Sequence, residues 1–199
     1  DNTFIKAKKS KKNNSNLKVT ILRNPVNQGY GGNVKIGFMH AIKNDFDYIA
    51  LTHADGQYPP EEIPKQLKLL LSNRYDVIFG SRMMNGFDAL KGGMPFYKFI
   101  GNKLTTWIEN RLIGTNLSEF HTGHQIYSVK ILKKIPFFLN SKDYHFHTQL
   151  VIQLLIAKAK IKETPIDTFY GDEISHVNGF SYCWNVCKEA LLIRLQKIG

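Results

Sequence analysis

The sequence predicts an α/β fold, in which a mainly parallel sheet carries helices on both of its faces. Two observations lead to this prediction: short apolar runs alternate with longer amphipathic segments, and polar or glycine-rich loops follow three of the runs. The length of 199 residues, with 43% hydrophobic and 22% charged residues, is that of one globular domain. Because ligands of such sheets bind at the carboxyl ends of the strands, we expect those three loops to line one site.

Each element is predicted from its spacing of apolar residues. The run at residues 47–52 is continuous enough for a strand that is buried on both faces. Pro60 with Glu61 and Glu62 marks a helix start, since proline suits the first turn and acids suit its positive end. The predicted strands are residues 18–23, 47–52, 75–79 and 160–163. The predicted helices are residues 33–44, 60–72, 95–112, 129–134, 146–159 and 182–197.

Positive charge is concentrated at the N-terminal end. The chain has 27 Lys+Arg against 16 Asp+Glu, a formal net charge of +11, and residues 1–18 contain six lysines and one acid. Residues 8–16 have no apolar side chain, so we expect residues 1–17 to be a basic, flexible, solvated segment beside a single domain. The charge favours an anionic partner, but no nucleic acid is expected, because the chain has no recognised binding motif and no stacking aromatic residues interleaved with the lysines.

Neither a disulfide framework nor a membrane span is expected. The two cysteines, Cys183 and Cys187, are four residues apart and suit one face of a helix. No apolar run reaches the length of about 18 residues that a spanning helix needs, and no signal-peptide pattern opens the chain. These features predict a cytoplasmic protein.

The first loop of the predicted site is glycine-rich. It runs from Asn24 to Gly32 and precedes a helix, so its backbone N–H groups could approach a phosphate or ribose closely. The spacing matches neither the dinucleotide fingerprint nor the P-loop, and a plain turn explains it equally well.

The second loop places oxygen ligands after a buried strand. Asp55 and Gln57 suit Mg²⁺ or Mn²⁺ holding a diphosphate, although a single acid after a strand is common without a metal.

Four motifs in this order carry a resemblance to a known family. They are Asn27-Gln-Gly-Tyr-Gly-Gly32, His53-Ala-Asp-Gly-Gln-Tyr-Pro-Pro-Glu61, Gly80-Ser-Arg82 and Ser118-Glu-Phe-His-Thr-Gly123. Together they resemble the family 2 glycosyltransferases, and most closely the dolichyl- or polyprenyl-phosphate sugar synthases and their bacterial relatives. Further similar segments extend the resemblance over nearly the whole chain: Gly92-Gly-Met-Pro-Phe-Tyr-Lys98, Gly101-Asn102 and Tyr170-Gly-Asp-Glu-Ile-Ser175.

The resemblance implies a GT-A fold and the inverting transfer of one sugar from a UDP- or GDP-sugar. It also implies that Mg²⁺ or Mn²⁺ neutralises the diphosphate leaving group. Asp55 matches the second acid of the family's DxD motif, a metal ligand and catalytic residue, and Gln57 matches the glutamine that follows it. The resemblance assigns nucleotide-sugar binding to Asn27, Gly29, Gly31, His53 and Arg82, the last through bidentate contact with phosphate oxygens.

On the acceptor side, Glu119 is the candidate catalytic base for a hydroxyl acceptor. A phosphate acceptor is already anionic at neutral pH, so Glu119 would then only orient groups. The resemblance places the acceptor at the turn that follows Glu119, and for His121 a structural role is equally open. The expected acceptor-binding residues are His121, Thr122, Gly123 and Gln125.

Three departures from the family pattern affect these expectations. His53 replaces the first acid of the DxD pair, and Gln125 stands where relatives often have arginine, which favours a hydroxyl acceptor. The opening Asp1-Asn2-Thr3 looks like the tail of a motif that ends the family's second strand. We therefore expect an N-terminally truncated sheet without its first two strands, or half of a split enzyme. A partner or self-association would complete the sheet edge.

The expected activity is sugar transfer from a nucleotide sugar to a polyprenyl phosphate. The alternatives are transfer to a hydroxyl of a surface polysaccharide or glycan, and a non-catalytic, partner-dependent subunit. A lipid acceptor would bring peripheral contact with the inner face of the membrane, through residues 91–103 or 182–198. Packing against the core is the other interpretation of both segments, and Trp107 and Trp184 are expected in the core.

Overall fold

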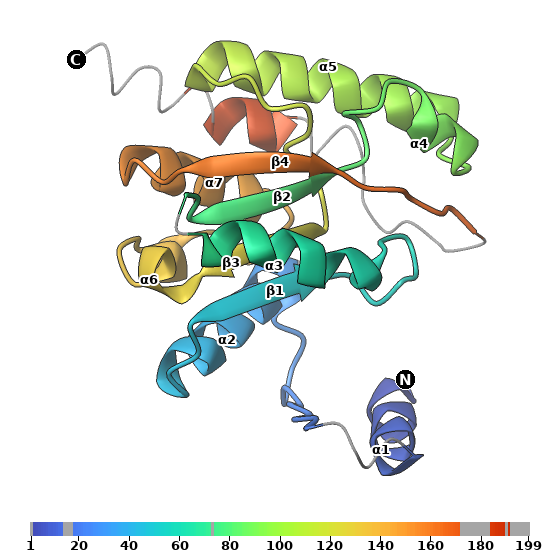
Figure 1. The fold of residues 1–199 in the computed structure, drawn as a ribbon, viewed down its shortest axis with the longest axis vertical. Helices are drawn as coiled ribbons and strands as arrows, with labels where there is room; N and C mark the ends of the chain where they lie inside the picture. The colour runs from blue at the N-terminus through green and yellow to red at the C-terminus, as the bar shows by residue number, and fades with distance from the viewer. Residues whose placement is uncertain (1, 14–17, 73, 172–183, 190, 192–199) are drawn as a thin grey trace.

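A four-stranded sheet forms the centre of the molecule (Figure 1). The computed structural model describes residues 2–13, 18–72, 74–171, 184–189 and 191. The order of the strands across the sheet is β1-β3-β2-β4. Their bounds are β1 Tyr48–Thr52, β2 Val77–Ser81, β3 His124–Ser128 and β4 Ile161–Pro165.

The sheet is mixed because β3 runs against its neighbours. It pairs antiparallel with β1 and with β2, so that Ile126 lies opposite both Ala50 and Ile78. Strands β2 and β4 are parallel, with Phe79 opposite Glu163. Three of the four strands therefore run in one direction, as the α/β prediction requires, but the sequence did not predict the antiparallel β3.

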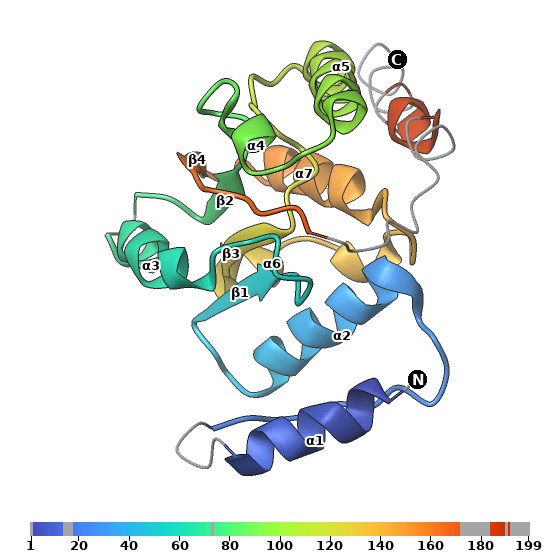
Figure 2. The ribbon, with the colours of Figure 1, turned by 90° about the vertical axis from the view of Figure 1, so that its right-hand side faces the viewer.

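Helices pack on both faces of the sheet, as predicted (Figure 2). Val77, Phe79 and Tyr127 lie in one core cluster with residues of α2 and α7, whereas Ile78 and Ile126 pack with Leu70 of α3. This division follows the alternation of side chains along a strand. The α-helices are α1 Thr3–Asn13, α2 Gly29–Lys43, α3 Ile63–Leu71, α4 Asp88–Lys91, α5 Phe96–Ile113, α6 Val129–Leu132 and α7 Phe146–Ile156. Two 3-10 helices are η1 Pro60–Glu62 and η2 Phe137–Leu139.

Two strand predictions were wrong. Residues 18–23 form no strand, and Leu22 is exposed. A strand needs a neighbour that satisfies its backbone groups, and no described strand pairs with this segment. Strand β1 is not buried on both faces, because it is the end strand of the sheet and exposes Ala50.

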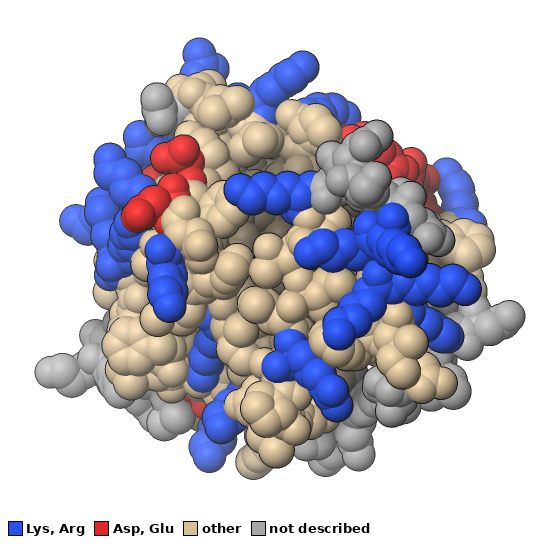
Figure 3. Space-filling view, turned by 90° about the horizontal axis from the view of Figure 1, so that it is seen from below, with Lys and Arg blue, Asp and Glu red and all other residues tan. Residues whose placement is uncertain are grey.

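The basic N-terminal segment is helical over part of its length. Helix α1 covers residues that were expected to form a loop; residues 14–17 lie outside the described part. Lys and Ala favour helix, and neither Gly nor Pro interrupts the chain before Pro25. Seen from the end of the molecule where α1 lies, Lys and Arg side chains are spread over the surface (Figure 3).

The C-terminal prediction is covered only in part. Residues 184–189 and 191 are helical, and the remainder of the predicted helix at 182–197, with Cys183, lies outside the described residues. Residues 172–175 of the motif that begins at Tyr170 also lie outside them. Within the described chain, no helix has both the length and the hydropathy that crossing a bilayer requires.

Candidate active site at the carboxyl ends of β1 and β2

Three segments meet where β1 and β2 end: the loop after β1, the end of β2, and the turn before β3. The His53 N–H donates to the Gly123 carbonyl at 3.2 Å, which joins the loop after β1 to the turn before β3. A Cβ on Gly123 would lie 2.5–2.6 Å from atoms of the His53 ring. Only glycine therefore lets the turn approach the imidazole this closely.

The Asp55 loop has an ordered backbone and an accessible carboxylate. Asp55 Oδ1 accepts a hydrogen bond from the Gln57 N–H at 3.0 Å, and Gly56 between them has φ +78°. The Gln57 carbonyl accepts from Thr168 Oγ1 at 2.9 Å, which ties the loop to the segment after β4. The Asp55 side chain is 34% exposed, so a ligand can reach its carboxylate.

His53 lies beside Asp55, with Nδ1 3.7 Å from Asp55 Oδ2. Burial lowers the pKa of the His53 imidazole, although the nearby Asp55 carboxylate raises it and Arg82 lowers it further. The imidazole is therefore neutral near pH 7 and does not supply the negative charge of the acid it replaces.

Tyr30 and His147 extend this contact into the protein. The Tyr30 hydroxyl lies 3.0 Å from His53 Nε2 and also hydrogen-bonds His147 Nε2. Burial, with the neighbouring His53 and His121, lowers the pKa of His147 to about 3. The sequence did not single out Tyr30 as a site residue, although it lies within the glycine-rich motif.

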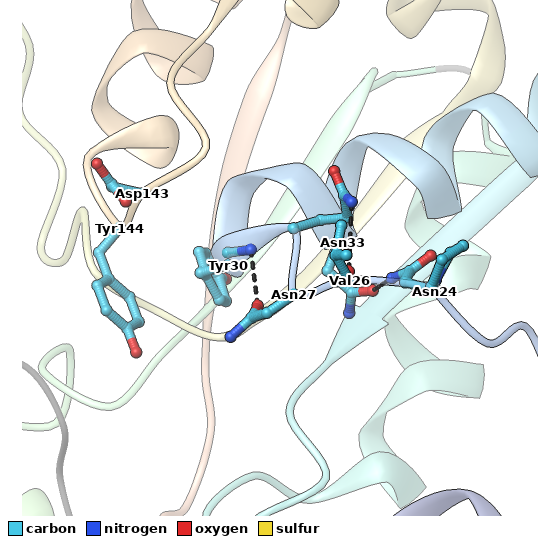
Figure 4. A pocket seen from close by; sticks show the side chains of 10 residues that line it. Asn24, Val26, Asn27, Tyr30, Asn33, Asp143 and Tyr144 are labelled. Atoms are coloured by element: carbon cyan, nitrogen blue, oxygen red, sulfur yellow. Dashed lines mark hydrogen bonds between the residues drawn. The ribbon is translucent and has the colours of Figure 1, made fainter.

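A hollow of about 730 Å³ opens beside the glycine-rich loop (Figure 4). The rings of Tyr30 and Tyr144 stack in it, with centroids 5.3 Å apart and planes 19° from parallel. Asn27 Oδ1 accepts from the Gly29 N–H at 2.9 Å. The hollow is lined by residues 24–30 together with Asn33, Asp143 and Tyr144.

Packing within the chain explains why two of the predicted donor-site residues are glycines. Gly29 has φ +71°, and a Cβ there would lie 2.6 Å from the Lys142 carbonyl oxygen. A Cβ on Gly31 would lie 2.5 Å from the Ser141 carbonyl oxygen. Asn27 and Gly29 line the hollow, but Gly31 does not, because it packs under the loop before α7 and donates to Lys142.

Arg82 and Glu119 form a buried ion pair. Glu119 accepts from the Arg82 backbone N–H and from Arg82 Nε, each at 2.9 Å, and from Arg82 Nη2. Asn102 of α5 adds a fourth hydrogen bond at 2.9 Å, and Arg82 Nη1 donates to the Tyr170 hydroxyl at 2.8 Å. Arg82 was expected to contact phosphate, but in this arrangement its side chain is 6% exposed and its guanidinium hydrogen-bonds Glu119, the Tyr170 hydroxyl and the His121 carbonyl.

Glu119 is a weak base in this environment. Burial by itself would raise the pKa of its carboxyl, but the Arg82 guanidinium and its hydrogen bonds hold that pKa below the ordinary value. A carboxylate with a lowered pKa accepts protons poorly at neutral pH. Its four hydrogen bonds and complete burial indicate that Glu119 orients the turn.

Glu163, Asn102 and Glu109 were missed as site residues. Glu163 of β4 accepts from the Ser118 N–H and hydroxyl at 2.8 and 2.7 Å and from the Glu119 N–H at 3.1 Å. Glu109 of α5 lies 3.0 Å from His121 Nε2 and accepts from Thr148 Oγ1 at 2.9 Å. For Glu109 the sequence held a signal: it lies seven residues after Asn102 on the predicted helix, and therefore on the same face.

Most of the predicted acceptor residues build the turn. Thr122 Oγ1 donates to the Gly80 carbonyl, and Gln125 Nε2 donates to the Thr122 carbonyl at 3.0 Å while its Oε1 accepts from Tyr127. Thr122 and Gln125 are completely buried in this arrangement, and contact of either with the acceptor stays a prediction. His121 is nearly buried against Glu109, and Gly123 packs under His53.

The family model for glycosyl transferase family 2 matches residues 1–136. The chain belongs to this family. The resemblance that the four motifs carried is thereby confirmed.

Two of the relatives reported for this family 2 chain are named for lipid-phosphate acceptors. UDP-N-acetylglucosamine–dolichyl-phosphate N-acetylglucosaminyltransferase of Methanococcus voltae is 29% identical over 153 residues, or 77% of this chain and 60% of that protein. Undecaprenyl-phosphate mannosyltransferase of Micrococcus luteus is 26% identical over 161 residues, or 78% and 63%. An uncharacterized protein of Methanocaldococcus jannaschii is 33% identical over 152 residues, or 76% and 62%. The chain spans about three fifths of the length of these relatives.

Solved structures of a glycosyltransferase share the fold. Glucosyl-3-phosphoglycerate synthase from Mycobacterium tuberculosis with phosphoglyceric acid has a TM-score of 0.58 at 12% identity, covering 99% of this chain and 64% of that one. The same enzyme with Mn²⁺, UDP and glucosyl-3-phosphoglycerate has a TM-score of 0.54, at the same identity and coverage. The GT-A fold expected for a family 2 glycosyltransferase is confirmed.

The residues of this glycosyltransferase domain fit a metal ion that the substrate also ligates. In the described residues, no group of three or more His, Cys, Asp and Glu is placed to hold a metal. Mg²⁺ and Mn²⁺ at phosphate-transferring or phosphate-releasing sites often use one or two carboxylates, with phosphate oxygens and water as the other ligands. The accessible Asp55 carboxylate, with Gln57 two residues on, suits that mode.

Proposed function

We propose that the chain transfers a sugar from a nucleoside-diphosphate sugar to a polyprenyl phosphate, with inversion at the anomeric carbon. The observation that carries the proposal is the accessible Asp55 carboxylate at the carboxyl end of β1, in a chain of glycosyl transferase family 2. The relatives named for dolichyl- and undecaprenyl-phosphate support the acceptor class.

On the donor side, the nucleoside occupies the hollow beside Tyr30, and the diphosphate lies toward Asp55. The stacked tyrosine rings offer an aromatic surface, and the amides of Asn27 and Asn33 offer hydrogen bonds. Asp55 and Gln57 would hold Mg²⁺ or Mn²⁺, which when bound neutralises the charge of the departing diphosphate. His53, neutral and held by Tyr30, keeps the Asp55 loop in place.

On the acceptor side, the weak basicity of Glu119 favours a phosphate over a hydroxyl. A phosphate oxygen is already anionic at neutral pH, so it can form the bond to the anomeric carbon while the bond to the diphosphate breaks. Gln125 favoured a hydroxyl acceptor at the level of sequence, but its burial removes that argument. A lipid acceptor places the protein at the surface of the membrane that carries it.

The test is transfer of label from radioactive UDP-N-acetylglucosamine, UDP-glucose or GDP-mannose to undecaprenyl phosphate, with Mg²⁺ or Mn²⁺. We expect one donor to give labelled, butanol-soluble lipid, and Asp55→Asn to reduce the rate by about 100-fold. The matched control is Asp45→Asn, which also removes one exposed carboxylate; Asp45 has φ 51°, a conformation that asparagine accepts. We expect the control to stay within about twofold of the unchanged chain.

Other outcomes identify the alternatives. Label in a glycan and none in lipid would show a hydroxyl acceptor. No transfer, together with no thermal stabilisation by UDP, GDP or CDP in the presence of Mn²⁺, would show a non-catalytic subunit, because a ligand that binds only the folded state must stabilise it.

A further inference from the structure

Helix α5 exposes a stripe of large apolar side chains. Four of them, spaced three or four residues apart, lie along one side of the helix, and Tyr97 widens the stripe. The five side chains are between 47% and 72% exposed. We call this set the α5 stripe: Phe96, Tyr97, Ile100, Leu104 and Trp107.

The opposite side of α5 is the side that packs against the domain. Phe99, Thr105, Thr106, Glu109 and Ile113 are buried. The helix therefore has an inner face that packs against the core and the site. Nothing among the described residues covers its outer face. Trp107 was expected in the core and lies instead in the outer face. A contiguous apolar surface of this kind marks an interaction site.

The charges around the α5 stripe are positive. Lys103 lies 5.6 Å from the centre of the Phe99 ring and Arg111 lies 5.8 Å from the centre of the Trp107 ring. The only acid of α5, Glu109, is completely buried and paired with His121. Aromatic and aliphatic side chains flanked by cations suit the interface of a bilayer that contains anionic lipids.

The α5 stripe adjoins the site. Asn102, from the inner face of the same helix, donates to Glu119 at 2.9 Å. Phe87, which is exposed, stacks on Phe99 with ring centroids 5.7 Å apart and extends the apolar surface toward α4. In Figures 1 and 2, α5 is the outermost described element at the end of the molecule opposite α1.

We propose that the α5 stripe lies on the surface of an anionic lipid bilayer. Lys103 and Arg111 contact the headgroups, and the five apolar side chains enter the boundary between headgroups and acyl chains. The consequence of this contact rests on the proposed function: a helix α5 held on the bilayer brings the Arg82–Glu119 pair next to the phosphate of a membrane-borne acceptor.

The test is flotation with vesicles that contain no sugar donor and no polyprenyl phosphate. The vesicles consist of about 30% phosphatidylglycerol in phosphatidylcholine, or of phosphatidylcholine alone. The unchanged chain is expected to float with the anionic vesicles, and the triple variant Ile100→Gln, Leu104→Gln, Trp107→Gln to lose about tenfold in affinity. The control is Leu71→Gln, Phe138→Gln, Ile156→Gln, three side chains of matching exposure on other elements, and it is expected to bind within about twofold.

Four results would overturn the inference. They are no flotation of the unchanged chain, equal loss in both triple variants, undiminished binding by the α5 variant, and a dimer in sedimentation that the α5 variant separates while vesicle binding persists. The last result would assign the stripe to a second copy of the chain. Circular dichroism and thermal unfolding establish that both variants are folded before flotation.

A separate measurement distinguishes this inference from the proposed function. Thermal stabilisation by the nucleotide with Mn²⁺ does not depend on lipid, so the α5 variant is expected to retain it. Transfer to a short, water-soluble isoprenyl phosphate is likewise expected to persist in that variant. Vesicle binding without any transfer activity would contradict the proposed function and leave the inference about the surface supported.

Discussion

Two regions of the site handle their polar groups in opposite ways. After their roles in the proposed function, we call residues 24–30 and 53–57 the donor loops and residues 118–123 the acceptor turn. The donor loops are accessible: residues 24–30 line an open hollow, and the Asp55 side chain is a third exposed. The acceptor turn, residues 118–123, is closed: Glu119 is completely buried and accepts four hydrogen bonds. The donor loops leave polar groups that a ligand can hydrogen-bond. In the acceptor turn, other groups of the protein already supply those hydrogen bonds.

This difference predicts where substitutions will cost stability and where they will cost binding. Removing one member of a buried ion pair leaves a charge without compensation, which is strongly destabilising. Removing an exposed carboxylate costs little, because water replaces its contacts. The four predictions below run from the largest expected change in the free energy of unfolding to the smallest.

The substitution Glu119→Gln is expected to destabilise the chain most. The Arg82 side chain is only 6% exposed, and the substitution leaves its guanidinium without an anion. The new amide also turns its own hydrogens toward the Arg82 N–H groups. The expected loss is about 3–5 kcal/mol in urea unfolding at neutral pH. A loss below about 1 kcal/mol would show that the acceptor turn does not depend on this pair.

His147 is expected to make stability depend on pH. Its folded pKa of about 3 lies below the ordinary value of 6.5, so the unfolded chain takes up a proton as pH falls below 6.5 while the folded chain does not. The free energy of unfolding should fall by about 2 kcal/mol from this group between pH 7 and pH 5.

The variant His147→Gln tests that assignment, since glutamine can still hydrogen-bond the Tyr30 hydroxyl. It should remove that part of the pH dependence in urea unfolding, and the lowered pKa values of His53 and His124 should leave the remainder with the same sign. An unchanged slope would mean that His147 is not held neutral by the fold.

The contact between the two regions is tested by Gly123→Ala. The new Cβ would lie 2.5–2.6 Å from the His53 ring, which must move away from Asp55 and Tyr30. We expect a loss of about 1–3 kcal/mol in urea unfolding. Gly56→Ala is the control: Gly56 has φ +78° but open space around it, so it should cost only about 1 kcal/mol of backbone strain. A larger loss at Gly56 would contradict the close packing of the turn on His53.

The smallest change in stability is expected for Asp55→Asn. Its side chain is 34% exposed and one of its contacts, the turn to the Gln57 N–H, can be kept by an asparagine oxygen. The free energy of unfolding should change by less than about 0.5 kcal/mol, while the thermal shift produced by a nucleotide with Mn²⁺ should disappear. A large loss of stability with the shift retained would reverse the comparison between the two regions.

The elements whose apolar residues repeat at regular spacing were predicted well. Helices α2, α3, α5 and α7 and strands β1, β2 and β4 lie where their patterns indicated, within a few residues. Strand β3 was missed because His124 and Gln125 interrupt its apolar pattern. Both are buried, and the partner of His124, Gln66 at 2.8 Å from Nε2, lies 58 residues away in the sequence and reaches it only in the folded chain.

The sequence by itself determined the family, the fold class and the loops of the candidate site, because ordered motifs and local periodicity are properties of the chain. Only the tertiary structure decided what each polar side chain does. Arg82 and Glu119 are 37 residues apart, and Glu109 is 12 residues from His121, so no local pattern reveals their pairing. The tertiary structure also decided that Trp107 faces outward. Helix α5 has apolar residues on two sides, and only one side can pack against the domain.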